Sequence, residues 1–392
     1  MSNVRYSAAK TSRVTKKMTG IPSVKKMQQD LKKILPSNQQ YLKNLQSNKS
    51  IKKQSRENDK DGLVVTDYNV ELDYQLGSQQ DLIVAVDTIL NNQWSESTNL
   101  HDKYHVDKTS DMETQIFLLS GLGTNYKADI IKYRLNLAKL ITINQLYTIF
   151  QTQGNTFVDK NLEKKIRQGQ LRKFVITNAS PVILRSLQKY QNGKITYGFE
   201  NVEIICKTQD YNQAIENDRT KLMKELQKST LSTSEKQKKQ LLLSSLDKFY
   251  QFINENPTKL FININENLNF ENLSELLTLG YITMTSNHLQ EIESHQYSIS
   301  YPGCGSFLKL VNNGRVWLVK NLSKAKNNQM LESKLFDIWE GFNPQGQSKM
   351  NNFRSPFYGY DLNWILADAL GAGIVDVFNT PVGRGWKLTG KV

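Results

Sequence analysis

Histidines, cysteines and glycine-rich loops are the residues through which this sequence could bind a metal ion or carry out catalysis, and they are few. His101 and His105 lie four residues apart, as two ligands on one helical face would, but no adjacent Glu or Cys completes a metal-binding set. Residues 121–124 (Gly-Leu-Gly-Thr) resemble part of a phosphate-binding loop, yet no Lys-Ser or Lys-Thr pair follows them. We therefore expect ordinary surface and turn positions here, and no metal ion or other cofactor.

The residues of an enzyme active site are also missing from the sequence. Cys206 and Cys304 are far apart, which excludes a disulfide framework or zinc module and favours a reducing compartment. No basic residue lies closer to Cys304 than Lys309, so we expect Cys304 to open a helix rather than to act as a nucleophile. Neither a Gly-x-Ser-x-Gly motif nor the His-Arg-Asp, Asp-Phe-Gly and Val-Ala-Ile-Lys motifs of protein kinases occur. We expect no enzymatic activity.

Basic residues carry the remaining functional chemistry, and many of them lie at the N-terminus. Residues 1–60 hold 15 Lys and Arg against 3 Asp and Glu, a net charge of +12 in a chain whose total is +14. Such a segment is typical of an arm that binds nucleic acid or an import receptor. The candidate nuclear import residues are Lys16, Lys17, Lys25 and Lys26. The nucleus is therefore the expected location, with an organellar transit peptide or a plain solvated tail as the alternatives.

Three blocks of the remaining chain contain no acidic residue. Residues 164–199, 295–331 and 377–392 hold eight, five and three Lys or Arg. Such blocks suit contacts to phosphate, because each neutralised phosphate releases counterions and adds affinity that is independent of base sequence. The candidate DNA contacts are Lys164, Lys165, Arg167, Arg172 and Lys173, then Lys309, Arg315, Lys320, Lys324 and Lys326, and finally Arg384 and Lys387. Each residue alone could be a solvated charge, so the inference rests on their clustering.

The elements that must position these residues follow a repeated pattern. Three segments each predict a helix, a glycine that ends it and a short strand: residues 162–177, 270–285 and 362–378. A second strand is predicted at residues 297–301 and 386–388 in the last two segments, whereas residues 181–191 look helical in the first. Further helices are predicted before the segments, at residues 127–140, 144–152, 241–255 and 329–340. Helices, glycine and a β-hairpin in this order are the plan of a winged helix.

The sequence therefore predicts a mainly helical α+β fold with small β-hairpins. We expect three consecutive winged-helix domains after a disordered basic N-terminal arm, and no segment that spans a membrane. The predicted boundaries are 1–60 for the arm, 61–111 for an acidic segment with a helix, 112–205, 241–326 and 327–392 for the winged helices, and 206–240 for a linker. An extended polar helix is the alternative for residues 227–240. The helix of the acidic segment is predicted at residues 81–94, with an apolar face of Leu82, Val86, Ile89 and Leu90.

Part of the sequence resembles the family of serine/threonine-protein kinase 19. The resemblance is carried by residues 301–309 (Tyr-Pro-Gly-Cys-Gly-Ser-Phe-Leu-Lys), Gly314-Arg315, residues 323–326 (Ser-Lys-Ala-Lys), Asp361-Leu362, residues 370–372 and residues 374–376. It is specific over residues 241–392, weaker over 112–205 and absent from the basic arm. The resemblance implies three winged-helix units that bind double-stranded DNA and, despite the family name, no kinase activity. By matching position, the DNA contacts implied are Lys309, Arg315, Lys324 and Lys326.

The same resemblance implies a role similar to that of a transcription-coupled nucleotide excision repair factor. Such a factor bridges the stalled RNA polymerase II repair complex, including the Cockayne-syndrome ubiquitin ligase, to TFIIH and downstream DNA. The long arm, residues 206–240 and the predicted wing tip at residues 383–385 depart from the family pattern, so protein-binding surfaces are not transferred. The alternative is an adaptor of the transcription machinery whose winged helices bind acidic proteins, with DNA contact incidental.

Overall fold

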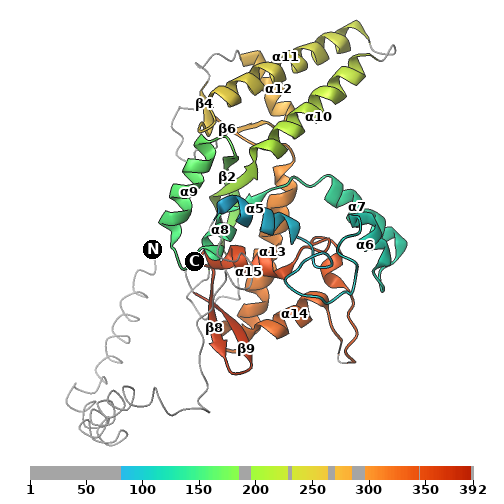
Figure 1. Ribbon diagram of the computed structural model, residues 1–392, viewed down its shortest axis with the longest axis vertical. Helices are drawn as coiled ribbons and strands as arrows, with labels where there is room; N and C mark the ends of the chain where they lie inside the picture. The colour runs from blue at the N-terminus through green and yellow to red at the C-terminus, as the bar shows by residue number, and fades with distance from the viewer. Residues whose placement is uncertain are drawn as a thin grey trace, which may run out of the picture. The chain divides into compact units, whose positions relative to one another are not determined.

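The computed structural model describes residues 81–184, 196–227, 232–263, 270–284, 296–343 and 345–389. The basic arm with its import lysines lies outside these ranges, as do residues 61–80. The described residues are mainly helical, with three small three-stranded antiparallel sheets (Figure 1). None of their helices is long and apolar enough to cross a membrane.

The acidic segment begins the described chain with the helix that its sequence predicts. Helix α5 (Leu82–Asn91) starts where the Asp81 side chain accepts a hydrogen bond from the backbone N–H of Ile83, which is a common N-cap. Leu82, Val86 and Ile89 are buried, as the apolar spacing predicts. Two helices follow, α6 (Met112–Leu118) and α7 (Thr124–Leu135).

The first sheet is built around a long hairpin. Its elements are β1 (Ile141–Thr142), α8 (Ile143–Ile149), α9 (Asn155–Arg167), β2 (Leu171–Leu184) and β3 (Thr196–Lys207). Gly169 has a φ of 70° between α9 and β2, a left-handed conformation that glycine adopts without strain. Residues 181–184 are paired with β3 through their backbone, so the helix predicted at 181–191 is wrong for these four residues.

The second sheet follows two long helices. The elements are α10 (Thr208–Leu226), α11 (Thr233–Glu255), β4 (Phe261–Asn263), α12 (Phe270–Leu279), β5 (Ile282–Met284) and β6 (Gln296–Ile299). The linker predicted at residues 206–240 is corrected by α10, whose residues Tyr211, Ile215 and Leu222 are buried. These apolar residues recur at helical spacing and form one face of α10. The many polar residues between them made this pattern hard to recognise in the sequence.

The third sheet is preceded by α13, the helix that holds most of the second acid-free block. The elements are α13 (Cys304–Lys324), the short 3₁₀ helix η1 (Lys326–Asn328), β7 (Gln329–Leu331), α14 (Glu332–Glu340), the 3₁₀ helix η2 (Asn351–Phe353), α15 (Leu362–Gly371), β8 (Val375–Thr380) and β9 (Gly383–Leu388). Residues 329–331 form a strand where a helix was predicted. Gly371 still belongs to α15, and the left-handed residue is Gly373, with a φ of 72°.

All three sheets have the same strand order. Their orders are β1-β3-β2, β4-β6-β5 and β7-β9-β8. In each sheet the last strand in sequence is therefore central, and the first and second strands pair with its two edges. The strands β1, β4 and β7 were not predicted. Each has two or three residues, which is too short for an alternating pattern to be visible in a sequence.

The hydrophobic cores join the repeats rather than separating them. One cluster of buried residues combines α5, α8 and α9 with α13 and α15. A second combines the other face of the first sheet with α10, α11, the second sheet and the start of α13. Helices α8 and α15 are adjacent in Figure 1, and Gly371 lies so close to Asn144 that a Cβ atom would overlap its backbone oxygen. Helix α13 therefore contributes to both cores.

Candidate nucleic-acid interface

Three lysines form a stripe along α13. Lys309, Lys320 and Lys324 are exposed, and none forms an ion pair with a carboxylate in the described part of the chain. A helix turns by about 100° per residue, which places Lys320 about 20° and Lys324 about 60° around the axis from Lys309. The stripe is about 22 Å long at the helical rise per residue. Several phosphates along one DNA strand could be contacted over this length.

The stripe continues beyond the end of the helix. Lys326, in η1, is exposed and completes what we call the α13 lysine surface: Lys309, Lys320, Lys324 and Lys326. Lys387 on β9 is also exposed and is paired in register with Gln329, which directly follows η1. Its other cross-strand neighbour is Asp376, an exposed acidic residue on β8. The structure thus brings together four predicted contacts of the second block, and Lys387 lies next to the end of this surface at η1.

Arg315 does not belong to this surface, which corrects its prediction as a DNA contact. It lies about 240° around α13 from Lys309, on the buried side of the helix. Its residue is 2% exposed, and its Nε and Nη2 atoms donate to the Asp368 carboxylate at 2.5 and 3.1 Å. Asp368 also accepts a hydrogen bond of 2.7 Å from the Thr142 hydroxyl. Arg315 therefore fastens α13 to α15 and to the start of α8.

Arg172 is likewise buried, and its prediction as a DNA contact is also wrong. The residue is 3% exposed, and its Nη2 atom donates to the backbone oxygen of Ile253 at 2.7 Å. Ile253 lies in the last turn of α11, where unpaired carbonyl groups and the helix dipole favour a cation. Burial lowers the pKa of the Arg172 guanidinium. Arg172 therefore ties the first sheet to α11.

Four of the other predicted contacts form ion pairs with acidic residues: Lys165 with Asp81 at 3.2 Å, Arg167 with Glu163 at 2.8 Å, Lys173 with Glu203 at 3.3 Å and Arg384 with Glu332 at 2.9 Å. Lys164, in the last turn of α9, is exposed and forms no ion pair among the described residues. A cation that is paired with a carboxylate attracts phosphate less strongly than an unpaired one. An exposed ion pair is weak, however, and its cation can exchange the carboxylate for a phosphate. Among the described residues, the α13 lysine surface is the better phosphate site.

The cysteines and histidines do not form a reactive or metal-binding site in the described part of the chain. Burial raises the pKa of both Cys206 and Cys304, which keeps these thiols protonated and poorly nucleophilic. His101 is not an ordinary surface residue, because its Nε2 atom lies 2.6 Å from the buried carboxylate of Asp361. His105 is exposed. No group of three metal-binding side chains occurs in the described ranges.

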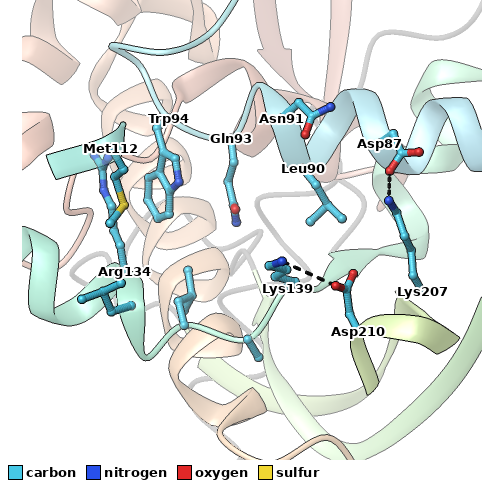
Figure 2. A pocket seen from close by; sticks show the side chains of 13 residues that line it. Asp87, Leu90, Asn91, Gln93, Trp94, Met112, Arg134, Lys139, Lys207 and Asp210 are labelled. Atoms are coloured by element: carbon cyan, nitrogen blue, oxygen red, sulfur yellow. Dashed lines mark hydrogen bonds and ion pairs between the residues drawn. The ribbon is translucent and has the colours of Figure 1, made fainter. Parts of the chain in front are cut away.

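A cavity of about 390 Å³ lies between α5, the end of α7 and the start of α10 (Figure 2). Two ion pairs line it, Asp87 with Lys207 and Lys139 with Asp210, the latter at 3.5 Å. Arg134 also lines the cavity and forms an ion pair with the buried Glu96, so all its cations have acidic partners and it offers no uncompensated positive charge to phosphate. It is not part of the proposed interface.

Sequence reasoning missed a polar stripe on α10, since residues 206–240 were expected to be a linker. Gln209, Asn212, Gln213 and Glu216 follow the spacing i, i+3, i+4, i+7 of one helical face. Tyr211 and Ile215 lie on the opposite, buried face. This spacing was visible in the sequence and could have revealed both the helix and its polar side.

Comparisons with known proteins cover most of the described chain. A family model described as Stk19, inactive serine-threonine protein kinase 19, matches residues 110–388. The serine/threonine-protein kinase mug51 of Schizosaccharomyces pombe is 24% identical over 256 residues, which are 64% of this chain and 67% of that protein. The two names disagree about activity. The region matched by the family model contains all three sheets and the α13 lysine surface, and it excludes the basic arm.

Proposed function

We propose, starting from the fact that the chain belongs to the Stk19 family, that it is a non-enzymatic protein that binds double-stranded DNA. The observation that carries this proposal is the α13 lysine surface, four exposed lysines in a block without acidic residues. The family's description as inactive agrees with the missing kinase motifs, because nothing in the sequence would position a phosphoryl group and its metal ions. The affinity would come from phosphate contacts and would not depend on base sequence.

Each repeat is, in this proposal, a winged-helix domain. The first has α7, β1, α8, α9 and the hairpin β2–β3, and the third has α13, β7, α14, α15 and the hairpin β8–β9. The second has α11, β4, α12 and the hairpin β5–β6, with residues 264–269 outside the described ranges. The shared strand order supports one plan for all three. Helix α13 would then open the third domain rather than close the second.

The cellular role that we propose is transcription-coupled nucleotide excision repair in the nucleus. The support is the family membership together with a phosphate-binding surface that reads no particular base. A scaffold between a stalled RNA polymerase II repair complex, TFIIH and downstream DNA needs affinity for any DNA sequence, because damage occurs at any sequence. Crosslinking with mass spectrometry in nuclear extract would identify the DNA and protein neighbours together.

The second candidate function is an adaptor that binds proteins of the transcription machinery. It is favoured by apolar side chains on α6 and α7, where Phe117, Leu118 and Tyr126 are exposed. Exposed apolar residues that lie close together are typical of protein-binding surfaces. A stable protein complex in a pull-down, without binding of duplex DNA in a gel shift, would favour the adaptor. Magnesium-dependent binding of ATP would instead favour a kinase.

Charge reversal on the α13 lysine surface tests DNA binding. We expect Lys324→Glu with Lys326→Glu to weaken binding of every duplex sequence by roughly tenfold and to make binding less dependent on salt, because phosphate contacts are lost. Fluorescence anisotropy with labelled duplexes over a range of salt concentrations measures both effects. Lys238→Glu with Lys248→Glu is the matched control, since these exposed lysines of α11 give the same change in net charge. Equal losses in the two double variants would contradict the proposal.

A further inference from the structure

A cleft of about 470 Å³ lies along α10, beside the turn that joins α9 to β2 and the C-terminal part of α11. Gln209, Asn212, Gln213 and Glu216 of α10 line one wall, Tyr250 of α11 lines another, and Gly169 belongs to the turn. Helices α10 and α11 pack against each other, and they are adjacent in Figure 1. None of these residues was a predicted contact, and none lies on the α13 lysine surface.

The α10 wall offers groups that pair with the edge of a nucleobase. Gln209 and Gln213 are exposed, and Asn212 is half-buried. The Gln213 Nε2 atom donates to the Asn217 Oδ1 atom at 3.0 Å, which leaves its second N–H and its oxygen for a base. The Asn212 Oδ1 atom is buried and has no hydrogen-bond partner in the described part of the chain. Side-chain amides carry a donor and an acceptor side by side, the arrangement that pairs with adenine. A buried acceptor without a partner is costly, and a base in the cleft could satisfy this atom if the Asn212 side chain turned toward it.

Tyr250 offers an aromatic ring at the same cleft. Tyr250 is 39% exposed, and its ring does not pack against another aromatic ring in the described part of the chain. Tyr211 and Tyr281, by contrast, are buried and pack against other aromatic rings. An exposed tyrosine that is held on a rigid helix can stack on any base, because every base has an aromatic face.

The charges around the cleft determine which part of a nucleic acid can enter it. Glu216 at one end would repel a phosphate but could accept a hydrogen bond from a base amino group. The last turn of α9 supplies Lys164 and Arg167, both exposed, before the turn at Gly169. The ion pair of Arg167 with Glu163 is exposed and therefore exchangeable. A Cβ atom at Gly169 would meet no other atom within 4 Å, so the turn itself does not close this side of the cleft.

We propose that the α10 cleft binds one unpaired nucleobase, preferentially adenine, whose ring stacks on Tyr250 and whose edge pairs with the amides of Gln209, Asn212 and Gln213. The neighbouring phosphates lie toward the last turn of α9. This inference rests on the proposed binding of DNA and extends it from phosphate contacts to a damaged or opened duplex. Unpaired adenines in DNA and in RNA share the recognised chemistry.

Duplexes that differ at a single position test this site. The probes are a fully paired duplex, the same duplex with one bulged adenine, and the same bulge with an abasic residue, each made in DNA and in RNA. We expect the full chain to bind the bulged adenine about tenfold more tightly than the abasic bulge, as stacking of one base requires. We expect Tyr250→Ala to abolish this ratio without changing affinity for the paired duplex, and Tyr250→Phe to retain it.

Tyr126→Ala is the matched control, because Tyr126 is also an exposed tyrosine but lies on α7, and it should leave the ratio unchanged. Gln209→Ala with Gln213→Ala should lower the preference for a bulged adenine over a bulged thymine. Equal affinity for the adenine and abasic bulges, with normal binding of the paired duplex, would overturn the nucleobase site and leave DNA binding intact. Failure to bind any of the probes would overturn both. A preference seen only with the RNA probes would support the site and assign RNA as its source.

Discussion

Arg315 and Lys320 both lie on α13 within the same acid-free block, yet only Lys320 faces solvent. The difference follows from the helical angle, because Arg315 lies on the side that packs against α15 and Lys320 lies on the stripe opposite to it. The family resemblance placed Arg315 among the DNA contacts, whereas its position relative to the apolar residues of α13 would have predicted burial. Leu308, Val311 and Leu322 are buried on the same side of the helix.

Removal of Arg315 should destabilise the fold rather than weaken DNA binding directly. We expect Arg315→Ala to lower the free energy of unfolding by about 3–5 kcal/mol, because Asp368 would keep a buried and unpaired charge. Lys320→Ala should change it by about 0.5 kcal/mol or less, since its side chain is exposed. Urea unfolding followed by circular dichroism measures both values. Similar values for the two variants would show that the ion pair does not hold α13 in place.

Buried tyrosines should make the fold sensitive to alkaline pH. Burial raises the pKa of Tyr133 to about 12, and it raises the pKa of Tyr211, Tyr281 and Tyr360 further. A tyrosine whose pKa is higher in the folded state contributes stability that is present below its unfolded pKa of about 10 and is lost as the pH rises toward the folded value. We expect the free energy of unfolding to fall as the pH rises above about 10.

Tyrosinate absorbance and circular dichroism, recorded during one alkaline titration, measure this effect. The tyrosinate of the buried phenols should appear together with the loss of helix, because these phenols ionise only when the chain unfolds. Tyr133→Phe should reduce the pH dependence in the range between pH 10 and about 12, where Tyr133 differs between the two states. Full ionisation of the tyrosines while the helical signal is unchanged would contradict this account.

At the scale of elements, Gly371 is required by packing rather than by a turn. It was predicted to end α15, but the structure places it within the helix and against the backbone of α8. We expect Gly371→Ala to lower the free energy of unfolding by about 1–3 kcal/mol, because its Cβ atom would overlap the Asn144 oxygen. Gly305→Ala in α13 is the control, since a Cβ atom there meets nothing within 4 Å. That change should have no cost or a small benefit, and thermal unfolding of both variants decides the point.

The sequence predicts the helices that have strong periodicity and misses elements that depend on partners distant in the chain. Helix α12 has its predicted bounds, and α5 and α15 differ from theirs by three residues at most. The strands β1, β4 and β7 are defined only by pairing with a later strand. The same holds for residues 181–184, which are paired with β3 although their local pattern favoured a helix. Tertiary pairing overrides local propensity in these cases.

For the candidate interface, the sequence identifies which blocks carry positive charge but not which charges are compensated. Lys165 and Lys173 pair with Asp81 and Glu203, acidic residues that lie outside the acid-free block in sequence and close to it in space. Lys324 and Lys326 keep their charge unpaired among the described residues. An acid-free stretch therefore indicates a basic surface only where the fold brings no carboxylate to it from another segment.

At the scale of the whole molecule, the two shared cores place the three repeats in one packed body. The first core joins the first repeat to the third, and the second joins the first to the second. Arg315 and Arg172, predicted to contact DNA, instead hold these junctions together from within. A scaffold built in this way would present its phosphate contacts in a fixed arrangement.

Deletion of residues 1–60 separates the basic arm from this body. The arm holds +12 of the chain's net charge, and neither the family model nor the described elements include it. We expect the truncated protein to fold and to bind duplex DNA with lower affinity at low salt, because non-specific phosphate contacts are lost.

A fluorescent fusion lacking Lys16, Lys17, Lys25 and Lys26 should enter the nucleus less efficiently.

The decisive measurement adds Lys324→Glu and Lys326→Glu to the truncated protein and compares duplex affinity by fluorescence anisotropy. If the α13 lysine surface binds DNA by itself, the double substitution should weaken binding by the same factor with and without the arm, because distant and independent contacts add in free energy. Complete loss of binding on truncation alone would instead assign the affinity to the arm. The lysines of α13 would then be solvated charges on the surface of a protein-binding scaffold, as the adaptor function requires.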